Sequence, residues 1–292
     1  MGTLDGKVAV VTGAGSGIGR ALARELDRRG CRLALSDIDL VAVEKVAADC
    51  RQAVAHELDV ADRDAVLAYA DTVVAEFDTV HMLVNNAGVA LAADAEEQQF
   101  EDIDWLLGIN LNGVISGTQA FLPHLIASGD GHLVNVSSIF GVIAFPGQSA
   151  YNAAKFGVRG YTEAIAMEMA INDRPVQVHT VHPGGIKTNI ANAARKAGAD
   201  QDLVALFDRA ATTSPEAAAR IIVRGIERGT RRIHVGWDSH LIHAIERVVG
   251  SGYLAGMARL APAVLRASGF GAIVSRRRNA PVTPPTSREG TA

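Results

Sequence analysis

A tyrosine and a lysine four residues apart, Tyr151 and Lys155, have a spacing that suggests acid–base chemistry. Residues four apart share one face of a helix, so the Lys155 ammonium can lie beside the Tyr151 phenol and favour its ionised form. A free tyrosine has a pKa near ~10, and a general base works best when its pKa is nearer the pH of the reaction. The pair therefore predicts a phenol with a lowered pKa that serves as a general acid and base. The alternative is a chance pair on a surface helix.

A glycine-rich segment near the N-terminus is suited to binding a phosphate group. Residues Thr12–Gly19 read TGAGSGIG, follow an apolar run and precede a helix predicted over residues 20–28. Glycines at such a turn let the backbone approach a pyrophosphate, which the amide groups at the start of the helix then bind. The spacing differs from G-x-G-x-x-G, and the alternative is an ordinary connection between a strand and a helix.

Asp37 ends the next apolar run, where a carboxylate would accept hydrogen bonds from the adenosine ribose of a dinucleotide. The same carboxylate would repel a 2′-phosphate, and neither Ser16 nor Ile38 offers a basic side chain to hold one. The sequence therefore favours NAD over NADP. The alternative role for an aspartate here is to cap the next helix, and we assign that role to Asp39.

These motifs require a scaffold that brings them to one edge. Short apolar runs alternate with helix-length segments, a pattern typical of a parallel sheet with helices on both faces. We predict a doubly wound α/β fold of the Rossmann type, in a single domain with about seven strands. The predicted strands are Val8–Val11, Arg32–Ser36, Ala53–Leu58, Met82–Asn85, His132–Ser137, Val176–His182 and Ile233–Gly236.

The C-terminal part of the chain differs from the predicted catalytic domain of residues 1–240. Residues 241–275 carry apolar side chains at helical spacing, which predicts an amphipathic helical extension packed on the domain or on a partner subunit. A helix lying on a membrane surface is the alternative. Residues 276–292 contain three adjacent arginines and three prolines, with little to bury, and are predicted to be a disordered tail.

Composition excludes several classes of protein. The chain has 292 residues, of which 48% are hydrophobic and 21% charged, as expected of a well-packed globular protein. A net charge of -4 argues against a nucleic-acid binder, and no apolar run is long enough for a transmembrane helix. Cys31 and Cys50 form no disulfide framework and no secretory signal precedes Val8, so we expect a cytoplasmic protein whose partner is a small molecule.

Histidines are numerous in the second half of the chain but lack the spacing of a metal site. They occur at positions 179, 182, 234, 240 and 243, without the paired arrangement of a catalytic metal centre. No metal is predicted. We expect His182 to border the cofactor cleft without a catalytic role.

In combination, these motifs resemble the short-chain dehydrogenase/reductase family, in its single-domain branch, over about residues 5–238. The family patterns T-G-x-x-x-G-x-G, N-N-A-G and Y-x-x-x-K correspond to Thr12–Gly19, Asn85–Gly88 and Tyr151 with Lys155. The resemblance implies a catalytic set of Asn110, Ser138, Tyr151 and Lys155, with Ser137 as the weaker serine. It implies cofactor contacts at Tyr151 and Lys155 and at Gly13, Ser16, Gly17, Ile18, Gly19, Asp37, Asp59, Val60, Asn86, Ala87, Gly88, Pro183, Gly184, Ile186 and Thr188.

The resemblance also implies a reaction, in which a hydride passes between a nicotinamide ring and the carbinol carbon of a secondary alcohol or ketone. Tyr151 would be the base in oxidation, Ser138 would bind the substrate oxygen, and Lys155 would bind the ribose hydroxyls. Asn110 would hold a water in a proton relay. Family members are usually dimers or tetramers, so a homodimer or homotetramer is implied as well.

The substrate is expected to be hydrophobic, because the three segments that should surround it, residues 139–145, 186–207 and 241–273, are largely apolar. Two other functions were weighed. One is a catalytically silent dinucleotide-binding regulatory or scaffold protein of the same fold. The other is a sugar-nucleotide epimerase or dehydratase, which fits poorly because such proteins are longer and have a different glycine spacing.

Overall fold

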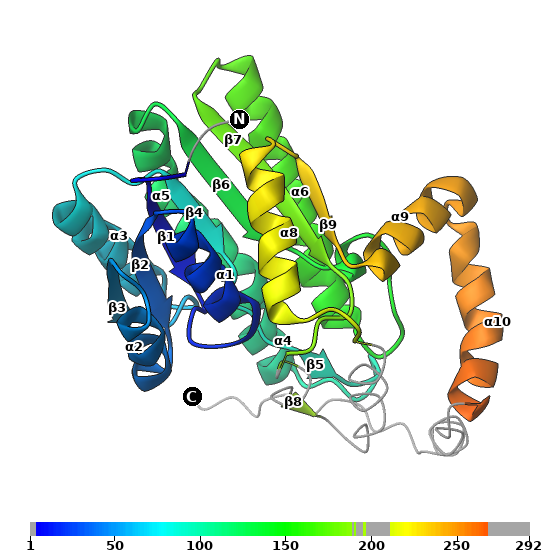
Figure 1. Cartoon of the computed structure of the whole chain (residues 1–292). Helices are drawn as coiled ribbons and strands as arrows, with labels where there is room; N and C mark the ends of the chain where they lie inside the picture. Colours follow the sequence, from blue (N-terminus) through cyan, green and yellow to red (C-terminus); the bar gives the residue numbers. More distant parts are fainter. Residues whose placement is uncertain (1–3, 189, 191–194, 197–210, 268–292) are drawn as a thin grey trace, which may run out of the picture.

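A central parallel sheet organises the computed structural model, which describes residues 4–188, 190, 195–196 and 211–267 (Figure 1). The strand order is β3-β2-β1-β4-β6-β7-β9. The order reverses between β1 and β4, and ligands bind at such a reversal in open α/β sheets. The predicted doubly wound fold is confirmed. The strands are β1 (Val8–Thr12), β2 (Arg32–Asp37), β3 (Ala53–Glu57), β4 (Met82–Asn85), β6 (Gly131–Val136), β7 (Val176–Pro183) and β9 (Arg232–Val235).

Helices cover both faces of the sheet (Figure 1). Successive side chains of a strand point to opposite faces, so Ala9 and Val11 of β1 pack into one core, whereas Val8 and Val10 pack into the other. One core is covered by α1 (Gly17–Arg28), α2 (Leu40–Ala48) and α8 (Pro215–Glu227), and the other by α3 (Arg63–Phe77), α5 (Gly113–Ala127) and α6 (Ser149–Ile171). The helix predicted from residue 20 begins three residues earlier, at Gly17, within the glycine-rich segment.

A chain of buried polar side chains joins two strands to two helices. Asn85 of β4 donates hydrogen bonds to Asn135 of β6 at 2.9 Å and to Thr118 of α5 at 3.2 Å. Asn135 in turn donates to Thr162 of α6 at 3.0 Å. Each of the two threonine hydroxyls donates to the carbonyl four residues earlier in its own helix. Because an unpaired polar group in the core is costly, this network fixes how α5 and α6 lie on the sheet.

A second, two-stranded sheet was not predicted. It pairs β5 (Leu91–Ala92) with β8 (Arg195–Lys196) in parallel. Two residues per strand are too few to produce a recognisable pattern. Most of the predicted substrate segment 186–207 and the predicted tail 276–292 lie outside the described residues.

The C-terminal extension consists of two helices rather than one. Helix α9 (Trp237–Val249) begins directly after β9 and ends at Gly250, whose φ is +55°. Helix α10 (Gly252–Ala267) follows, beyond the β9 edge of the sheet (Figure 1). Among the helices that the structure describes, none has the length and apolar character needed to cross a bilayer.

Replacing Gly117 of α5 by alanine should destabilise the chain. A Cβ there would lie 2.4 Å from the Asn85 side-chain oxygen, and overpacking of this kind costs about 1–3 kcal/mol. Gly160→Ala in α6 is the matched control, because no atom lies within 4 Å of its added Cβ and alanine favours a helix by up to ~1 kcal/mol. Urea unfolding should therefore shift in opposite directions for the two variants. Equal shifts would contradict the close approach of α5 to Asn85.

Candidate active site

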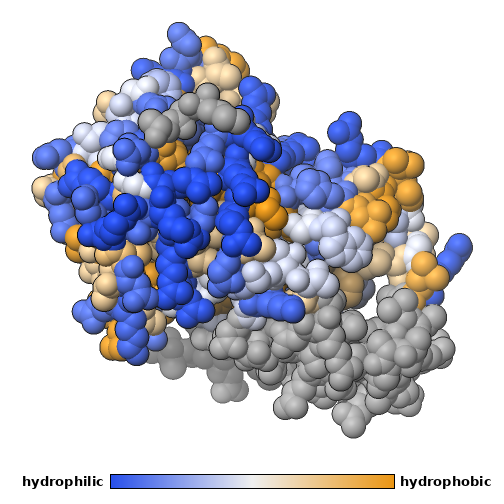
Figure 2. Space-filling model, in the orientation of Figure 1, coloured by the Kyte–Doolittle hydropathy of each residue, from blue (hydrophilic) through white to orange (hydrophobic). Residues whose placement is uncertain are grey.

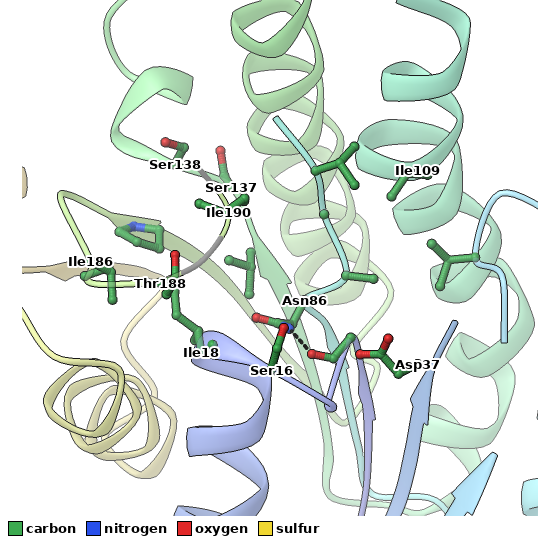
Figure 3. Close-up of a pocket in the computed structure, with 18 of the residues that line it drawn as sticks. Ser16, Ile18, Asp37, Asn86, Ile109, Ser137, Ser138, Ile186, Thr188 and Ile190 are labelled. Carbon is green, nitrogen blue, oxygen red and sulfur yellow. Dashed lines mark hydrogen bonds between the residues drawn. The ribbon is translucent and has the colours of Figure 1, made fainter. Parts of the chain in front are cut away.

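A cleft of about 400 Å³ lies at the carboxyl ends of the strands, where β1 and β4 diverge (Figure 3). Figure 3 shows Asp37 and Ser138 toward opposite ends of this cleft, with Ser16 and Ile18 between them. The cleft is lined by all the predicted site residues except Gly19 and Asn110. Sequence reasoning missed several residues that also line it, namely Ile38, Leu58, Val89, Ile109, Val136 and Ile190, and it had given Ser137 only a minor place.

The turn after β1 is locked to the turn after β4. The Asn86 side-chain amide donates to the carbonyls of Thr12 and Gly13, at 2.9 and 3.1 Å, while the Thr12 hydroxyl accepts from the backbone amides of Asn86 and Ala87. Gly13 has a φ of +65°, and a Cβ on it would lie 2.7 Å from the Ala87 Cα. Gly19 packs against Gly13 from behind, which explains why it is needed although it does not line the cleft.

The start of α1 faces the cleft without a side-chain cap. Ser16, the residue before the helix, makes no capping hydrogen bond, whereas α2, α3 and α8 begin with capping side chains from Asp39, Asp62 and Ser214. The first amides of a helix carry a partial positive charge and need an acceptor. An uncapped helix start in a cleft bordered by glycines fits the pyrophosphate of a dinucleotide.

Asp37 is held in place by backbone amides. Its carboxylate accepts hydrogen bonds from the backbone amides of Gly15 at 2.8 Å and of Asp39 at 3.1 Å. Asp37 also lines the cleft. Asp39 caps α2 by accepting from Ala42 at 3.0 Å, as predicted. The capping role predicted for Asp39 is confirmed, whereas the ribose contact predicted for Asp37 stays a prediction for a residue that lines the cleft.

Ser138, Tyr151 and Lys155 meet at the other end of the cleft. The Ser138 hydroxyl hydrogen-bonds to the Tyr151 phenol, and the Lys155 ammonium lies 5.7 Å from the centre of the tyrosine ring. Ser137 donates its hydroxyl to the Lys155 carbonyl at 2.7 Å, so this serine supports α6. The structure thus separates the two neighbouring serines, and Ser138 is the one that faces the tyrosine.

The pKa of Tyr151 is raised, not lowered, in this structure. The phenol is surrounded by protein, which disfavours its charged form, although the hydrogen bond from Ser138 acts in the opposite direction. Lys155 donates to the Val136 carbonyl at 3.0 Å, and burial lowers the pKa of its ammonium to about 8. The prediction of a lowered tyrosine pKa was wrong for the chain alone. Desolvation of the phenol raises the pKa by more than its polar neighbours lower it.

Comparison with known proteins identifies the family of this chain. The family described as short chain dehydrogenase matches residues 7–199. The chain belongs to that family. The short-chain dehydrogenases are oxidoreductases, and the resemblance found in the glycine motif and in Tyr151 with Lys155 is confirmed across two thirds of the sequence.

Several relatives of this short-chain dehydrogenase are alcohol dehydrogenases by name. SadH of Mycobacterium tuberculosis, described only as an oxidoreductase, is 50% identical over 273 residues, 90% of this chain and 99% of its own. D-threitol dehydrogenase of Mycolicibacterium smegmatis is 41% identical over 65% of this chain and 74% of its own. Cyclohexanol dehydrogenase of an Acinetobacter species is 34% identical over 74% of this chain and 86% of its own.

A solved structure supports the same assignment. A short-chain dehydrogenase/reductase from Burkholderia phymatum, in complex with NAD, superposes with a TM-score of 0.77 at 27% identity, covering 98% of this chain and all of its own. The agreement includes the seven-stranded Rossmann sheet.

Asn110 lies behind the cleft of this short-chain dehydrogenase rather than on its surface. It sits in a π-helical turn, Gly108–Asn112, between α4 (Phe100–Leu107) and α5. Its side chain donates to the Val89 carbonyl and accepts from the Val89 amide, both at 2.8 Å. The side chain therefore holds the segment after β4 by two hydrogen bonds, a contact that spans 21 residues and had no signal in the sequence.

Asp238 is a second residue that the sequence did not reveal. Its carboxylate accepts from the Gly185 amide at 2.6 Å, and a Cβ on Gly184 would lie 2.2 Å from it. Because Pro183 and Gly184 line the cleft, Asp238 fixes one wall of the site from the start of α9. Only the pairing of β7 with β9 brings these distant segments together.

His182 does not border the cleft, contrary to expectation. It is buried behind Ser138, and its Nδ1 is 3.0 Å from the Ser138 carbonyl. Its ring stacks on His234, which stacks in turn on His243. Burial lowers the pKa of His182 to about 4, so the imidazole is neutral near pH 7 and its Nδ1–H can donate to Ser138.

The free energy of unfolding should fall as the pH is lowered from 7 to 5. Burial lowers the pKa of both His132 and His182 to about 4, whereas an unfolded histidine has a pKa near ~6.5. The unfolded chain therefore binds more protons in this window, and each histidine should cost about 2 kcal/mol of stability by pH 5. Urea unfolding at several pH values measures the slope.

His182→Asn tests the assignment, because asparagine can donate to Ser138 but does not titrate. The slope of stability against pH between 5 and 6.5 should decrease by roughly one proton. Measurements above pH 5 avoid most carboxylate titration. An unchanged slope would show that His182 is not held neutral in the folded chain.

Proposed function

We propose that this chain is an NAD-dependent alcohol dehydrogenase or ketone reductase that acts on a hydrophobic secondary alcohol or ketone. The observation that carries the proposal is a single cleft with Asp37 at one end and the set of Ser138, Tyr151 and Lys155 at the other. NAD, when bound, supplies the hydride acceptor or donor. The scaffold alternative is less well supported, because the chain retains every residue expected for chemistry.

The residues at the catalytic end have separate roles in this proposal. Tyr151 takes the hydroxyl proton in oxidation and returns it in reduction, and Ser138 binds the substrate oxygen. Lys155 holds the nicotinamide ribose and, through its positive charge, opposes the effect of burial on the phenol. Asn110 supports the site through Val89, and its proposed part in a proton relay requires a water at its backbone or beside Lys155.

Two features support a preference for NAD. The Asp37 carboxylate is held by two backbone amides, and in this proposal it accepts hydrogen bonds from the adenosine ribose. Among the residues that the structure describes, no basic side chain lines that part of the cleft, where Ile38, Leu58 and Asp59 lie. A 2′-phosphate would thus meet a negative charge without a positive partner. The other predicted contacts that line the cleft, where the two halves of the dinucleotide would lie, are Val60, Asn86, Ala87, Gly88, Pro183, Gly184, Ile186 and Thr188.

The hydrophobic substrate is proposed from the side chains near Ser138. Val89, Val136, Ile186 and Ile190 are among the apolar residues that line the cleft, and its polar lining includes Ser137, Ser138, Tyr151, Lys155 and Thr188. In the segment 139–145, Ile139, Val142 and Ile143 pack toward α9 and α10, whereas the Phe140 ring lies edge-on to Tyr151 with 6.4 Å between the ring centres. The named relatives differ in polarity, since one is a polyol dehydrogenase and another a cyclohexanol dehydrogenase. The apolar lining favours the alicyclic type.

We also propose that the enzyme is a homodimer or homotetramer in the cytoplasm. Both cysteines, Cys31 and Cys50, are free, which is consistent with a reducing compartment. Size-exclusion chromatography with light scattering gives the subunit number directly.

Tyr151→Phe should reduce kcat by at least about 100-fold with little effect on NAD binding, because the proton-transfer group is removed. The assay follows NADH formation with a panel that includes cyclohexanol, a steroid secondary alcohol and threitol. We expect cyclohexanol or the steroid to exceed threitol in kcat/KM. Binding of NAD without turnover of any alcohol or ketone would favour the scaffold function.

The neighbouring serines provide a matched pair of variants. Ser138→Ala should lower kcat by roughly 10- to 100-fold, because it removes a hydrogen bond to the substrate oxygen. Ser137→Ala should instead lower the free energy of unfolding by about 1 kcal/mol, since it loses the bond to the Lys155 carbonyl, and leave kcat within a few-fold. The opposite pattern would show that Ser137 is the catalytic serine.

Asp37→Ser should weaken discrimination between the coenzymes. Removing the carboxylate eliminates hydrogen bonds to the ribose and repulsion of a 2′-phosphate, so the ratio of kcat/KM for NAD over NADP should fall by roughly 10- to 100-fold. Initial rates with both coenzymes measure the ratio. A wild-type enzyme that prefers NADP would contradict the role given to Asp37.

A further inference from the structure

Helix α9 is covered on one face and exposes apolar side chains on another. Toward the body, Ser239 is fully buried and donates to the His182 carbonyl at 2.7 Å. On the opposite side, Trp237, Leu241, Ile245 and Val248 follow one another at helical spacing, with exposed fractions of 64, 49, 45 and 86%. These four side chains form a continuous apolar stripe that faces solvent.

Helix α10 continues this exposed apolar surface. It packs chiefly against α9 and is joined to the body through Tyr253, whose hydroxyl accepts from the Ala144 amide at 2.9 Å. Leu254 and Leu260 are 53 and 64% exposed. Figure 2 shows hydrophobic surface over the turn between the two helices, where Val248 and Val249 lie. We name residues 237–267 the C-terminal arm. Contiguous apolar surface of this kind marks a binding face.

The most exposed charges of the arm are positive. Among its side chains described through residue 260, the charged ones in the exposed class are Arg247 and Arg259. Asp238 and Glu246 are partly buried, and Asp238 is bonded to Gly185. In the sequence, residues 237–292 contain seven arginines and three acidic residues, a net charge of +4, within a chain whose total is -4. The preceding residues therefore carry a net charge of -8.

We propose that the C-terminal arm docks on an anionic lipid surface, with the apolar stripe at the boundary between headgroups and acyl chains and the arginines at the phosphates. Helices that bind such surfaces combine a stripe rich in Trp and Leu with arginine or lysine on the polar side.

The test measures binding of the full chain to vesicles, so it does not depend on any activity. Sedimentation with vesicles of phosphatidylcholine and phosphatidylglycerol in equal parts should pellet the protein at low salt. Vesicles of phosphatidylcholine alone should bind it at least roughly tenfold more weakly, and salt should reduce the binding to the anionic vesicles.

Two variants separate the apolar and charged contributions. Ile245→Gln with Val248→Gln should reduce binding by at least roughly tenfold, because the stripe loses two of its four apolar side chains. Arg247→Gln with Arg259→Gln should reduce it by roughly tenfold and flatten the salt dependence. All four positions are at the surface, so thermal unfolding should match that of the wild type.

Matched controls place the same changes elsewhere. Val41→Gln with Leu67→Gln alters two apolar side chains that are 59 and 46% exposed on α2 and α3, and Arg220→Gln with Arg224→Gln removes two exposed charges from α8. Neither control should change vesicle binding. The proposal is overturned if the wild type does not bind anionic vesicles, if the controls weaken binding equally, or if the stripe variant instead reduces the oligomer size and leaves vesicle binding intact.

Discussion

The cleft depends on the hydrogen bonds that lock the turn after β1 to the turn after β4. These two turns are about 70 residues apart in the sequence, but they lie side by side where the strand order reverses. Thr12 and Asn86 join them by four hydrogen bonds, and Gly13 lets the backbones touch. Because the first amides of α1 follow from the same turn, their direction is fixed by this contact. Asp37 is fixed in turn through Gly15.

The catalytic end is built on a compromise between packing and charge. Burial raises the pKa of the Tyr151 phenol and lowers the pKa of the Lys155 ammonium to about 8. The same burial excludes water, so the few polar groups of the site interact more strongly than they would in water. Ser138 is anchored twice, by its hydroxyl at the phenol and by its carbonyl near His182. The site is therefore held from the rear by residues that do not touch the cleft.

Local patterns predicted the sheet and most of the site, whereas distant contacts did not show in the sequence. Each predicted apolar run forms a strand, and Asp39 caps the next helix as predicted, because these features depend on neighbouring residues. The partner of Asn110 and the position of His182 depend on contacts 21 and 44 residues away. The direction of the Tyr151 pKa required the burial of the phenol, which spacing alone does not give.

The C-terminal helices touch both walls at the catalytic end of the cleft. Asp238 of α9 binds the Gly185 amide on one wall, and Tyr253 of α10 binds the Ala144 amide beside the segment that follows Ser138. Substitutions in these helices can thus reshape the pocket without altering a catalytic side chain. A change at the end of the chain can therefore alter the shape of the cleft while Ser138, Tyr151 and Lys155 keep their identities.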